Sequence, residues 1–338
     1  MKKLASILTA AALAATMGLG LSACTPEESA DGVSLRGISG ATDITPAAEI
    51  DYFVAAEPAV TTRANATGLH IVGDIQELYG SENGYPQAVI VAKNELVSLN
   101  ADFVQDFLEE VIANEAWLES ASAQTVLDAI TANLPAGSTP TFTANNLNAQ
   151  VIANCGIHFV PAYEDKERVT AFLAEMAEVD PTSVGTVSDD FFNGEDWTTS
   201  GGSDEISVYA PDGAPALALA KLMSEDNQFN QTSVDYNIVA ANAIQGYITG
   251  DNPVADICIL PLNAASKLLG SGQAYTMLGT VTNGNLYILS ESEEEITAQN
   301  IKELLTGKTV GVIQLAQVPG LTFKIILDKY GIPYETIG

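Results

Sequence analysis

The sequence predicts an α/β fold with largely parallel sheets. From residue 205 onward, short apolar stretches alternate with longer stretches of helical period, which is the pattern of strands connected by helices. The chain has 338 residues, of which 47% are hydrophobic, and this is enough apolar material for one large domain or two ordinary ones. A wholly disordered chain is excluded, because disorder requires low hydrophobicity.

The elements can be placed in order along the chain. Strands are expected at 33–38, 50–56, 69–72, 87–92, 206–210, 234–240, 257–260 and 309–313, with two more around 275–290. Helices are expected at 100–112, 125–134, 144–152, 166–176, 214–223, 243–249, 264–269, 297–305 and 321–330. Residues 193–205 lack an apolar period and are rich in Gly, Ser and acids, which is typical of a linker.

The first residues indicate export and lipidation. Two lysines precede an apolar run at 4–21, as in a signal peptide. The run ends in the tetrapeptide Leu-Ser-Ala-Cys at 21–24, which resembles the bacterial lipobox. We therefore expect a signal peptide at 1–23, a lipid on Cys24, a tether at 24–31, and an extracytoplasmic protein anchored to the bacterial cell membrane. The alternative is an ordinary signal peptide with an accidental cysteine.

The charge balance excludes several functions. The chain has 13 Lys and Arg against 43 Asp and Glu, a net charge of −30. So few cations cannot form a basic patch of useful size, so we expect no nucleic-acid partner and no electrostatic docking to an anionic membrane.

Cysteines and histidines are scarce. Three Cys and two His are too few for a multi-histidine metal site or a thiolate zinc cluster. Cys155 and Cys258 lie in apolar contexts, which favours two buried free thiols, although a disulfide is permitted outside the cytoplasm. His70 and His158 are also flanked by apolar residues, and a structural role is expected for both.

The sequence carries no catalytic signature. It has no Gly-x-Ser-x-Gly elbow, no phosphate-binding loop of the Gly-x-x-x-x-Gly-Lys type and no Gly-x-Gly-x-x-Gly, the motifs of common hydrolase and nucleotide sites. We therefore expect no enzyme activity, no cofactor and no metal.

Hydrogen-bonding residues follow several of the expected strands. Ligands of open α/β sheets bind at the carboxyl ends of strands and near helix N-termini. The candidate ligand-binding residues at such positions are Asp212, Gly213, Asn263, Thr282, Asn283, Gln314 and Glu57.

Four segments together resemble a known family. They are ISVYAPDGAP at 206–215, DICILPLNAA at 256–265, VIQLAQVPG at 312–320 and IDYFVAAEP at 50–58. They are similar to the NMT1/THI5-like substrate-binding proteins of ABC transporters, which include thiamine-pyrimidine, taurine/sulfonate and nitrate binders. The resemblance covers about residues 32–338, and it rests on the joint presence of the segments behind a lipobox rather than on one specific motif.

The order of the segments departs from that family. In the family, the part resembling 206–338 comes first and the part resembling 33–192 follows it. The exchange implies a circularly permuted order, with residues 193–205 joining the old termini. Thirteen residues reach at most ~43–47 Å, which suffices if those termini lie close together. A natural permutation, an engineered one and an assembly artefact all remain open.

The resemblance implies a two-lobe periplasmic-binding-protein-like fold of type II. Lobe I would be 87–284 and lobe II would be 32–86 with 285–338, each a mixed sheet flanked by helices. A hinge would let the lobes close on a ligand. The implied protein is a monomeric solute-binding lipoprotein that delivers a small molecule to an ABC transporter permease.

The seven candidate residues would then line the cleft between the lobes. Two carboxylates, Glu57 and Asp212, favour an amine or a nitrogen heterocycle such as a thiamine-pyrimidine-like ligand. The loops contain no Arg or Lys, which counts against nitrate or sulfonate. The alternatives are that Asp212 only caps the helix beginning near Ala214, and that Glu57 is a solvated loop acid.

Three other functions remain open. One is a taurine, sulfonate or nitrate binder of the same family. The others are a lipid-anchored enzyme, and a sensor or adhesin that reuses the fold.

Overall fold

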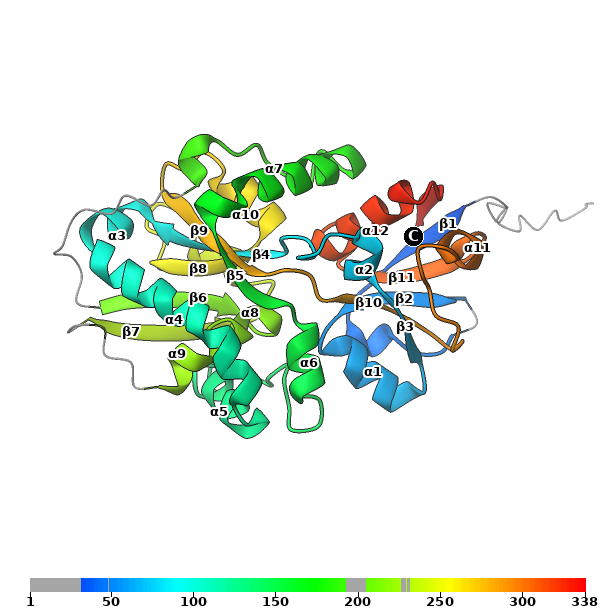
Figure 1. Ribbon diagram of the computed structural model, residues 1–338, viewed down its shortest axis with the longest axis horizontal. Helices are drawn as coiled ribbons and strands as arrows, with labels where there is room; N and C mark the ends of the chain where they lie inside the picture. The colour runs from blue at the N-terminus through cyan, green and yellow to red at the C-terminus, as the bar shows by residue number, and fades with distance from the viewer. Residues whose placement is uncertain (1–31, 48, 193–204, 226–228, 230–231) are drawn as a thin grey trace, which may run out of the picture.

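The computed structural model describes residues 32–47, 49–192, 205–225, 229 and 232–338. It has an α/β fold with two six-stranded sheets, which lie next to each other with helices on their faces (Figure 1). Sheet I has the order β5-β9-β4-β8-β6-β7, and sheet II has the order β12-β1-β11-β2-β10-β3. The predicted α/β class with mixed, helix-flanked sheets is confirmed. The predicted signal peptide, Cys24, the tether and linker residues 193–204 lie outside the described residues.

Sheet II is built from the two ends of the described chain. Its strands are β1 (Val33–Ile38), β2 (Tyr52–Ala56), β3 (His70–Asp74), β10 (Leu286–Ser290), β11 (Thr309–Ile313) and β12 (Tyr334–Ile337). The helices in these stretches are η1 (Ala41–Asp43), α1 (Ala59–Thr67), α2 (Ile75–Tyr79), α11 (Ile301–Leu305) and α12 (Val318–Lys329).

Sheet I is built from the middle of the chain. Its strands are β4 (Ala88–Lys93), β5 (Ile157–Pro161), β6 (Glu205–Pro211), β7 (Ser233–Val239), β8 (Ile257–Pro261) and β9 (Tyr275–Thr282). The helices in these stretches are α3 (Asn94–Leu99), α4 (Ala101–Ser120), α5 (Ala123–Ala132), α6 (Ala149–Asn154), α7 (Ala162–Val179), η2 (Asp189–Phe191), α8 (Ala214–Leu217), α9 (Ala220–Ser224), η3 (Ile244–Tyr247) and α10 (Leu262–Leu269).

Strand direction follows from the way the chain crosses between the sheets. β9 ends at Thr282 and β10 begins at Leu286, so β10 runs away from sheet I while its neighbour β2 runs toward it. In the other crossing the chain passes from α2 into β4, so β4 runs away from sheet II and is antiparallel to β8. The expectation of largely parallel sheets is therefore wrong. Each sheet joins a parallel part to antiparallel strands that carry or flank the crossings.

Local capping moved several predicted helix boundaries. The helix expected at 144–152 begins only at Ala149, because the side chain of Asn148 accepts a hydrogen bond from the Val151 N–H and starts the helix there. The helix expected at 243–249 is only a short 3-10 turn, η3. Helix α2 was not predicted. It is started by Asp74, whose carboxylate accepts from the N–H groups of Gln76 and Glu77.

One apolar cluster runs through both sheets. Along β4, Val89 and Val91 face one side and Ile90 faces the other, as the two-residue period of a strand requires. The cluster that contains Val89 and Val91 also contains Val54 and Val312 of sheet II. It is continuous because α7, from the sheet I part of the chain, packs on α12 from the sheet II part (Figure 1).

Aromatic rings fill the junction beside α7. The Tyr79 ring lies edge-on to Tyr85 and to Phe172, with centroid distances of 5.6 Å and 5.7 Å, a favourable geometry for aromatic pairs. The Tyr79 hydroxyl donates to Glu175 Oε2 at 3.0 Å. Burial, more than the neighbouring Glu175 carboxylate, raises the pKa of the Tyr79 hydroxyl, so the hydroxyl stays a donor across the usual pH range.

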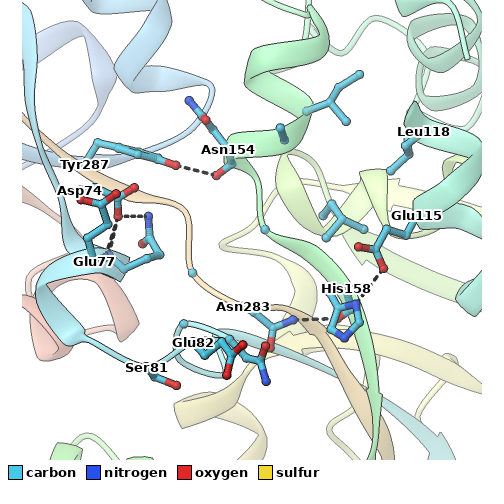
Figure 2. Close-up of a pocket in the computed structure, with 18 of the residues that line it drawn as sticks. Asp74, Glu77, Ser81, Glu82, Glu115, Leu118, Asn154, His158, Asn283 and Tyr287 are labelled. Atoms are coloured by element: carbon cyan, nitrogen blue, oxygen red, sulfur yellow. Dashed lines mark hydrogen bonds and ion pairs between the residues drawn. The ribbon is translucent and has the colours of Figure 1, made fainter. Parts of the chain in front are cut away.

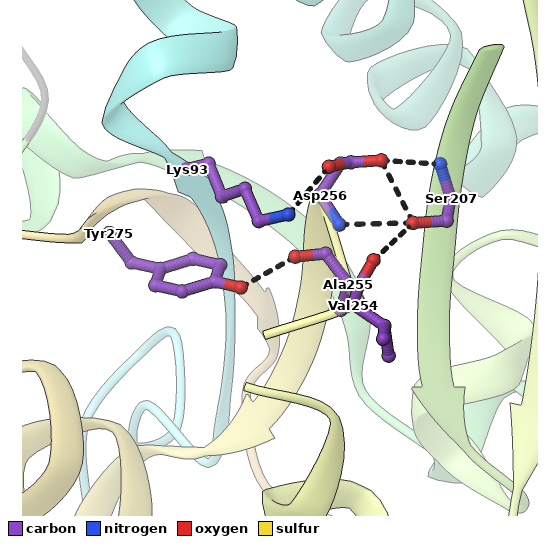
Figure 3. A network of polar contacts seen from close by, with 6 residues as sticks. All are labelled: Lys93, Ser207, Val254, Ala255, Asp256 and Tyr275. Atoms are coloured by element: carbon purple, nitrogen blue, oxygen red, sulfur yellow. Dashed lines mark hydrogen bonds and ion pairs between the residues drawn. The ribbon is translucent and has the colours of Figure 1, made fainter. Parts of the chain in front are cut away.

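A polar network ties the strands of sheet I together at the end remote from sheet II (Figure 3). The Asp256 carboxylate accepts from Lys93 Nζ at 2.9 Å, from the Ser207 N–H at 2.9 Å and from the Ser207 hydroxyl at 2.8 Å. Lys93 ends β4, Ser207 lies in β6 and Asp256 precedes β8. The carboxylate therefore joins three adjacent strands.

Asp256→Ala should lower the free energy of unfolding by about 3 kcal/mol, because it leaves the half-buried Lys93 ammonium and the Ser207 N–H without their acceptor. Urea denaturation at unchanged m value measures the loss. Asp251→Ala, at an exposed position of the preceding loop, is the control and should change stability by less than about 0.5 kcal/mol. Equal stability of the two variants would contradict the role given to Asp256.

None of the helices in the described ranges combines the length and the apolar character that crossing a membrane requires.

Candidate functional site

The carboxyl ends of the parallel strands in the two sheets point toward one another. β8 and β9 are both antiparallel to β4, so β8 ends at the edge of sheet I where the chain leaves, and β6 and β7 end beside it. In sheet II, β2, β11 and β1 end at the edge where β10 begins. We call these two edges the facing edges. Such edges are where α/β sheets bind ligands.

Side-chain amides bridge the two sides. Asn154, at the end of α6, donates through Nδ2 to Glu57 Oε1 at 3.1 Å. Asn263, in the first turn of α10, donates through Nδ2 to Gln317 Oε1 at 3.1 Å. Each bond links the sheet I part of the chain to the sheet II part, so the two facing edges are in direct contact in this structure.

Glu57 follows β2 and is only 4% exposed. Its carboxylate accepts from the Thr61 N–H at 3.2 Å, from the Thr61 hydroxyl at 2.7 Å and from Asn154 Nδ2 at 3.1 Å. The alternative that Glu57 is a solvated loop acid is therefore wrong. A ligand that reaches this carboxylate has to replace the Asn154 amide.

Asp212 follows β6 and is held by a distant loop. Its Oδ2 accepts from the N–H and from the hydroxyl of Thr141, both at 2.7 Å. Its Oδ1 is buried and has no hydrogen-bond partner among the described residues. The alternative that Asp212 caps the helix near Ala214 is wrong, because α8 has Gly213 at its N-cap and no side-chain cap bond.

Two further oxygens on this edge are buried without a partner. Asn263 is 2% exposed. Its Nδ2 donates to Ser183 O and to Gln317, but its Oδ1 accepts no bond from any described residue. Gln87 precedes β4; its Nε2 donates to Asn285 Oδ1 at 2.7 Å, and its Oε1 is likewise buried and unpaired. Buried polar atoms are normally hydrogen-bonded, so each of these oxygens can accept a bond from a further donor.

Backbone conformation singles out Gln314 and Gly213. Gln314 directly follows β11 and has a φ of 55°. No other non-glycine residue in the described ranges has a positive φ. Its side chain is exposed. Gly213 has a φ of 113°, which side chains rarely adopt. Strained backbone tends to persist at functional positions, and the assignment of Gln314 to the ligand site stays a prediction.

Thr282 and Asn283 lie where the chain leaves sheet I. Thr282 is 1% exposed and its carbonyl accepts from the Gln87 N–H at 2.9 Å. Asn283 Nδ2 donates to His158 O at 2.7 Å, and its Oδ1 accepts from Arg168 Nη2 at 2.6 Å. Both ends of the Asn283 amide therefore bind protein groups, and the side chain holds the crossing in place.

Arg168 of α7 ties both crossings to sheet I. Its guanidinium pairs with Asp165 through Nε and Nη2, at 2.6 Å and 3.0 Å. It also donates to Asn283 Oδ1, in the crossing between β9 and β10, and to Asn83 O, in the crossing between α2 and β4. Asp165 is 2% exposed, and it also accepts from the Thr280 hydroxyl. The ion pair is therefore bidentate, with a buried carboxylate and a mostly buried guanidinium.

A cavity of about 620 Å³ lies beside the crossings, within the ~300–1,000 Å³ range of small-molecule sites. Figure 2 shows it between α2 and β10 on one side and α6 and β5 on the other. Leu118, Ile152 and Tyr287 supply apolar wall. Of the predicted ligand-binding residues, only Asn283 lines this cavity.

The cavity is acidic. Its carboxylates are Asp74, Glu77, Glu82, Glu115 and Glu119, and among the described residues no Lys or Arg lines it. The ring of His158 pairs with Glu115 through Nδ1 at 2.7 Å. Burial raises the pKa of the Asp74 carboxyl, although the hydrogen bonds that it accepts from the N–H groups of Glu77 and Gln76 act to lower that pKa. His158 and His70 are both near half-exposed, with side-chain exposures of 52% and 44%.

The two cysteines of the described ranges, Cys155 and Cys258, are buried and free. The disulfide alternative is therefore wrong. Burial raises the pKa of both thiols, and protonated buried thiols are poor nucleophiles. In the described ranges, no group of three His, Cys, Asp or Glu side chains is arranged to hold a metal ion.

Sequence analysis missed Gln87, Thr141, Asn154 and Gln317. The residues expected at the site all follow strands, but Gln87 precedes β4, which runs opposite to β8 and so begins at the facing edge. Thr141 and Asn154 are 71 and 97 positions away from their partners Asp212 and Glu57. No local sequence pattern predicts contacts over such separations. Gln317 also follows β11, three residues after Gln314, so the strand-end criterion could have predicted it.

No family model, no curated protein and no solved structure matches this chain. Its function is therefore inferred from its own residues and geometry.

Arg168→Met should lower the free energy of unfolding by about 3 kcal/mol, since it leaves the Asp165 carboxylate buried without its cation. Replacing both partners, in Asp165→Leu/Arg168→Met, should recover more than half of the loss. Lys166→Met on the same helix is the control, because its pair with Asp189 is exposed and contributes little. Equal effects of Arg168→Met and Lys166→Met in urea denaturation would refute the role of the buried pair.

Gln314→Gly should raise the free energy of unfolding by about 0.5–1 kcal/mol. The steric strain that glycine removes at this positive φ exceeds the conformational entropy that it adds to the unfolded chain. Thermal and urea denaturation measure the change. A loss of stability would mean that the Gln314 side chain itself supports the fold.

Proposed function

We propose that this protein is an extracytoplasmic solute-binding lipoprotein that captures a small molecule between two lobes and delivers it to an ABC importer. The observation that carries the proposal is the pair of facing edges. Strand ends from two separate sheets oppose one another, and the described chain joins the sheets by two short crossings. A molecule held at both edges is bound only when the lobes are closed, so its binding drives closure.

The fold would be the two-lobe, type II periplasmic-binding-protein-like fold in circularly permuted order. Lobe I would be 87–284, and lobe II would be 32–86 with 285–338. The neighbouring positions of β1 and β12 support this order, since the Val33 N–H donates to Pro333 O at 2.8 Å. Phe192, which precedes the proposed linker 193–205, and Glu205, the last residue of that linker, both belong to the sheet I part of the chain.

The ligand would be an amine or a nitrogen heterocycle. None of the seven candidate residues is a cation, and the two charged ones, Glu57 and Asp212, are carboxylates. An anion such as nitrate or a sulfonate would meet acceptors rather than donors at these positions. A taurine, sulfonate or nitrate binder of the same family is the second candidate, because helix N-termini can hold an anion without a cation.

The cellular role follows from the leader. A lipid on Cys24 would hold the protein at the outer side of the cell membrane, where a monomer could pass its ligand to a permease. The absence of a catalytic signature in the sequence supports binding over catalysis. A lipid-anchored enzyme, or a sensor or adhesin, would share the anchor but not the delivery step.

A thermal-shift screen tests the function on the chain that begins at Thr25. The screen contains aminopyrimidines, polyamines, taurine, sulfonates and nitrate. A ligand present at 100 times its Kd adds about 2.7 kcal/mol to the free energy of unfolding, so a clear rise in Tm is expected with an aminopyrimidine or a polyamine. The rise should be lost in Glu57→Gln and in Asp212→Asn.

Glu115→Gln is the matched control, because Glu115 lines the cavity beside the crossings rather than the facing edges. It should leave the shift unchanged. If the control variant loses the shift while the other two keep it, the ligand binds in that cavity. A shift with taurine or nitrate alone would transfer the proposal to the second candidate.

A further inference from the structure

Three unpaired oxygens lie on consecutive strands of the sheet I edge. They are Gln87 Oε1 before β4, Asn263 Oδ1 after β8 and Asp212 Oδ1 after β6, and all three are buried without a partner in the part of the chain that the structure describes. These strands are neighbours in the order β4-β8-β6. Because neighbouring strands are ~4.8 Å apart, the three backbone positions lie within roughly 10 Å of one another.

The register places them at one level of the sheet. Ala88 pairs with Pro261, and the Leu262 N–H donates to Gln87 O at 3.0 Å, so Gln87 and Asn263 are nearly opposite each other. Tyr209 is level with Cys258, which puts Asp212 level with Pro261. The three side chains therefore begin at the same height on the facing edge.

The three unpaired atoms are oxygens, because a protein group binds the other end of each side chain. Asn263 directs its NH2 group to Ser183 O, and a backbone carbonyl can only accept. Gln87 directs its NH2 group to Asn285 Oδ1. Asp212 binds the Thr141 N–H and hydroxyl through Oδ2, and this leaves Oδ1 as a carboxylate acceptor. Each oxygen lacks a donor, and a bound molecule can supply one.

We infer that the ligand is recognised through its own N–H groups, which donate to a row of three acceptors, and that Gln87 is a specificity-determining residue of that row. This inference rests on the proposed function. It adds that positive charge alone is insufficient: a quaternary ammonium compound, which has no N–H, leaves all three oxygens unpaired. The row accepts primary amines, amidines and ring N–H groups.

The selectivity follows from the cost of an unpaired buried acceptor, about 1–3 kcal/mol for each group. A site built to hydrogen-bond an N–H group therefore rejects the analogue that lacks it far more strongly than a shape-matched apolar pocket does. Thr141 positions the row, because its two bonds hold Asp212 Oδ2 and leave Oδ1 unpaired.

Isothermal titration with matched probe pairs tests the inference. The pairs are 4-aminopyrimidine with 4-(dimethylamino)pyrimidine, and 1,4-diaminobutane with its bis(trimethylammonium) analogue, which has the same charge. At least one N–H probe should bind, and its fully methylated partner should bind at least about 100-fold more weakly. Equal affinity within either binding pair would overturn the inference, while the proposed function would stand.

Variants of Gln87 test its part in the row. Gln87→Met, which removes the acceptor at similar size, should weaken the N–H probe about 5- to 150-fold. Gln87→Glu keeps an acceptor oxygen and should retain the binding. Gln105→Met, at an exposed position on α4, is the matched control and should bind as the original protein does. Urea denaturation of each variant checks that it folds.

The outcomes separate the two proposals. Binding of an N–H probe that is insensitive to Gln87→Met in a folded variant would refute the role of Gln87. A crystal structure of the loaded protein with ordered waters, rather than ligand, on the three oxygens would refute the row. If no probe of the screen or of the pairs binds the unaltered protein, the proposed function itself fails.

Discussion

The two crossings between the sheets constrain the rest of the molecule. Since the chain passes from β9 into β10 within a few residues, β10 has to run against the strands that end beside it. That reversal sets strand ends from both sheets opposite one another and makes each sheet mixed. The position of the candidate site is therefore decided by how the chain connects the sheets, before any side chain at the site is considered.

Buried charge holds these crossings in position. Arg168 reaches both of them while its bidentate pair with Asp165 fixes the guanidinium. A guanidinium suits this role because it is rigid and carries several donors. The acidic cavity lies on the neighbouring side of the same crossings, so motion at this point would alter the cavity and the facing edges together.

The sequence was a good guide to the fold class and a partial guide to the site. Strand and helix alternation predicted the α/β architecture, and the strand-end criterion reached Asp212 and Asn263, which each have a buried unpaired oxygen. It missed Gln87, because strand direction is not encoded locally. It also missed Thr141, because a loop that closes over a site from far along the chain leaves no periodic signal. The roles of Glu57 and Asn283 depend on Asn154 and Arg168, which only tertiary packing brings near them.

The apolar cluster shared by both sheets has a consequence for cooperativity. Chains with two separate cores can melt in two steps, whereas a continuous core favours a single transition. Because α7 and α12 join the cores here, damage to either half of the molecule should be felt by the other. A ligand bound between the sheets would then protect the whole chain from local unfolding, including strands that it never touches.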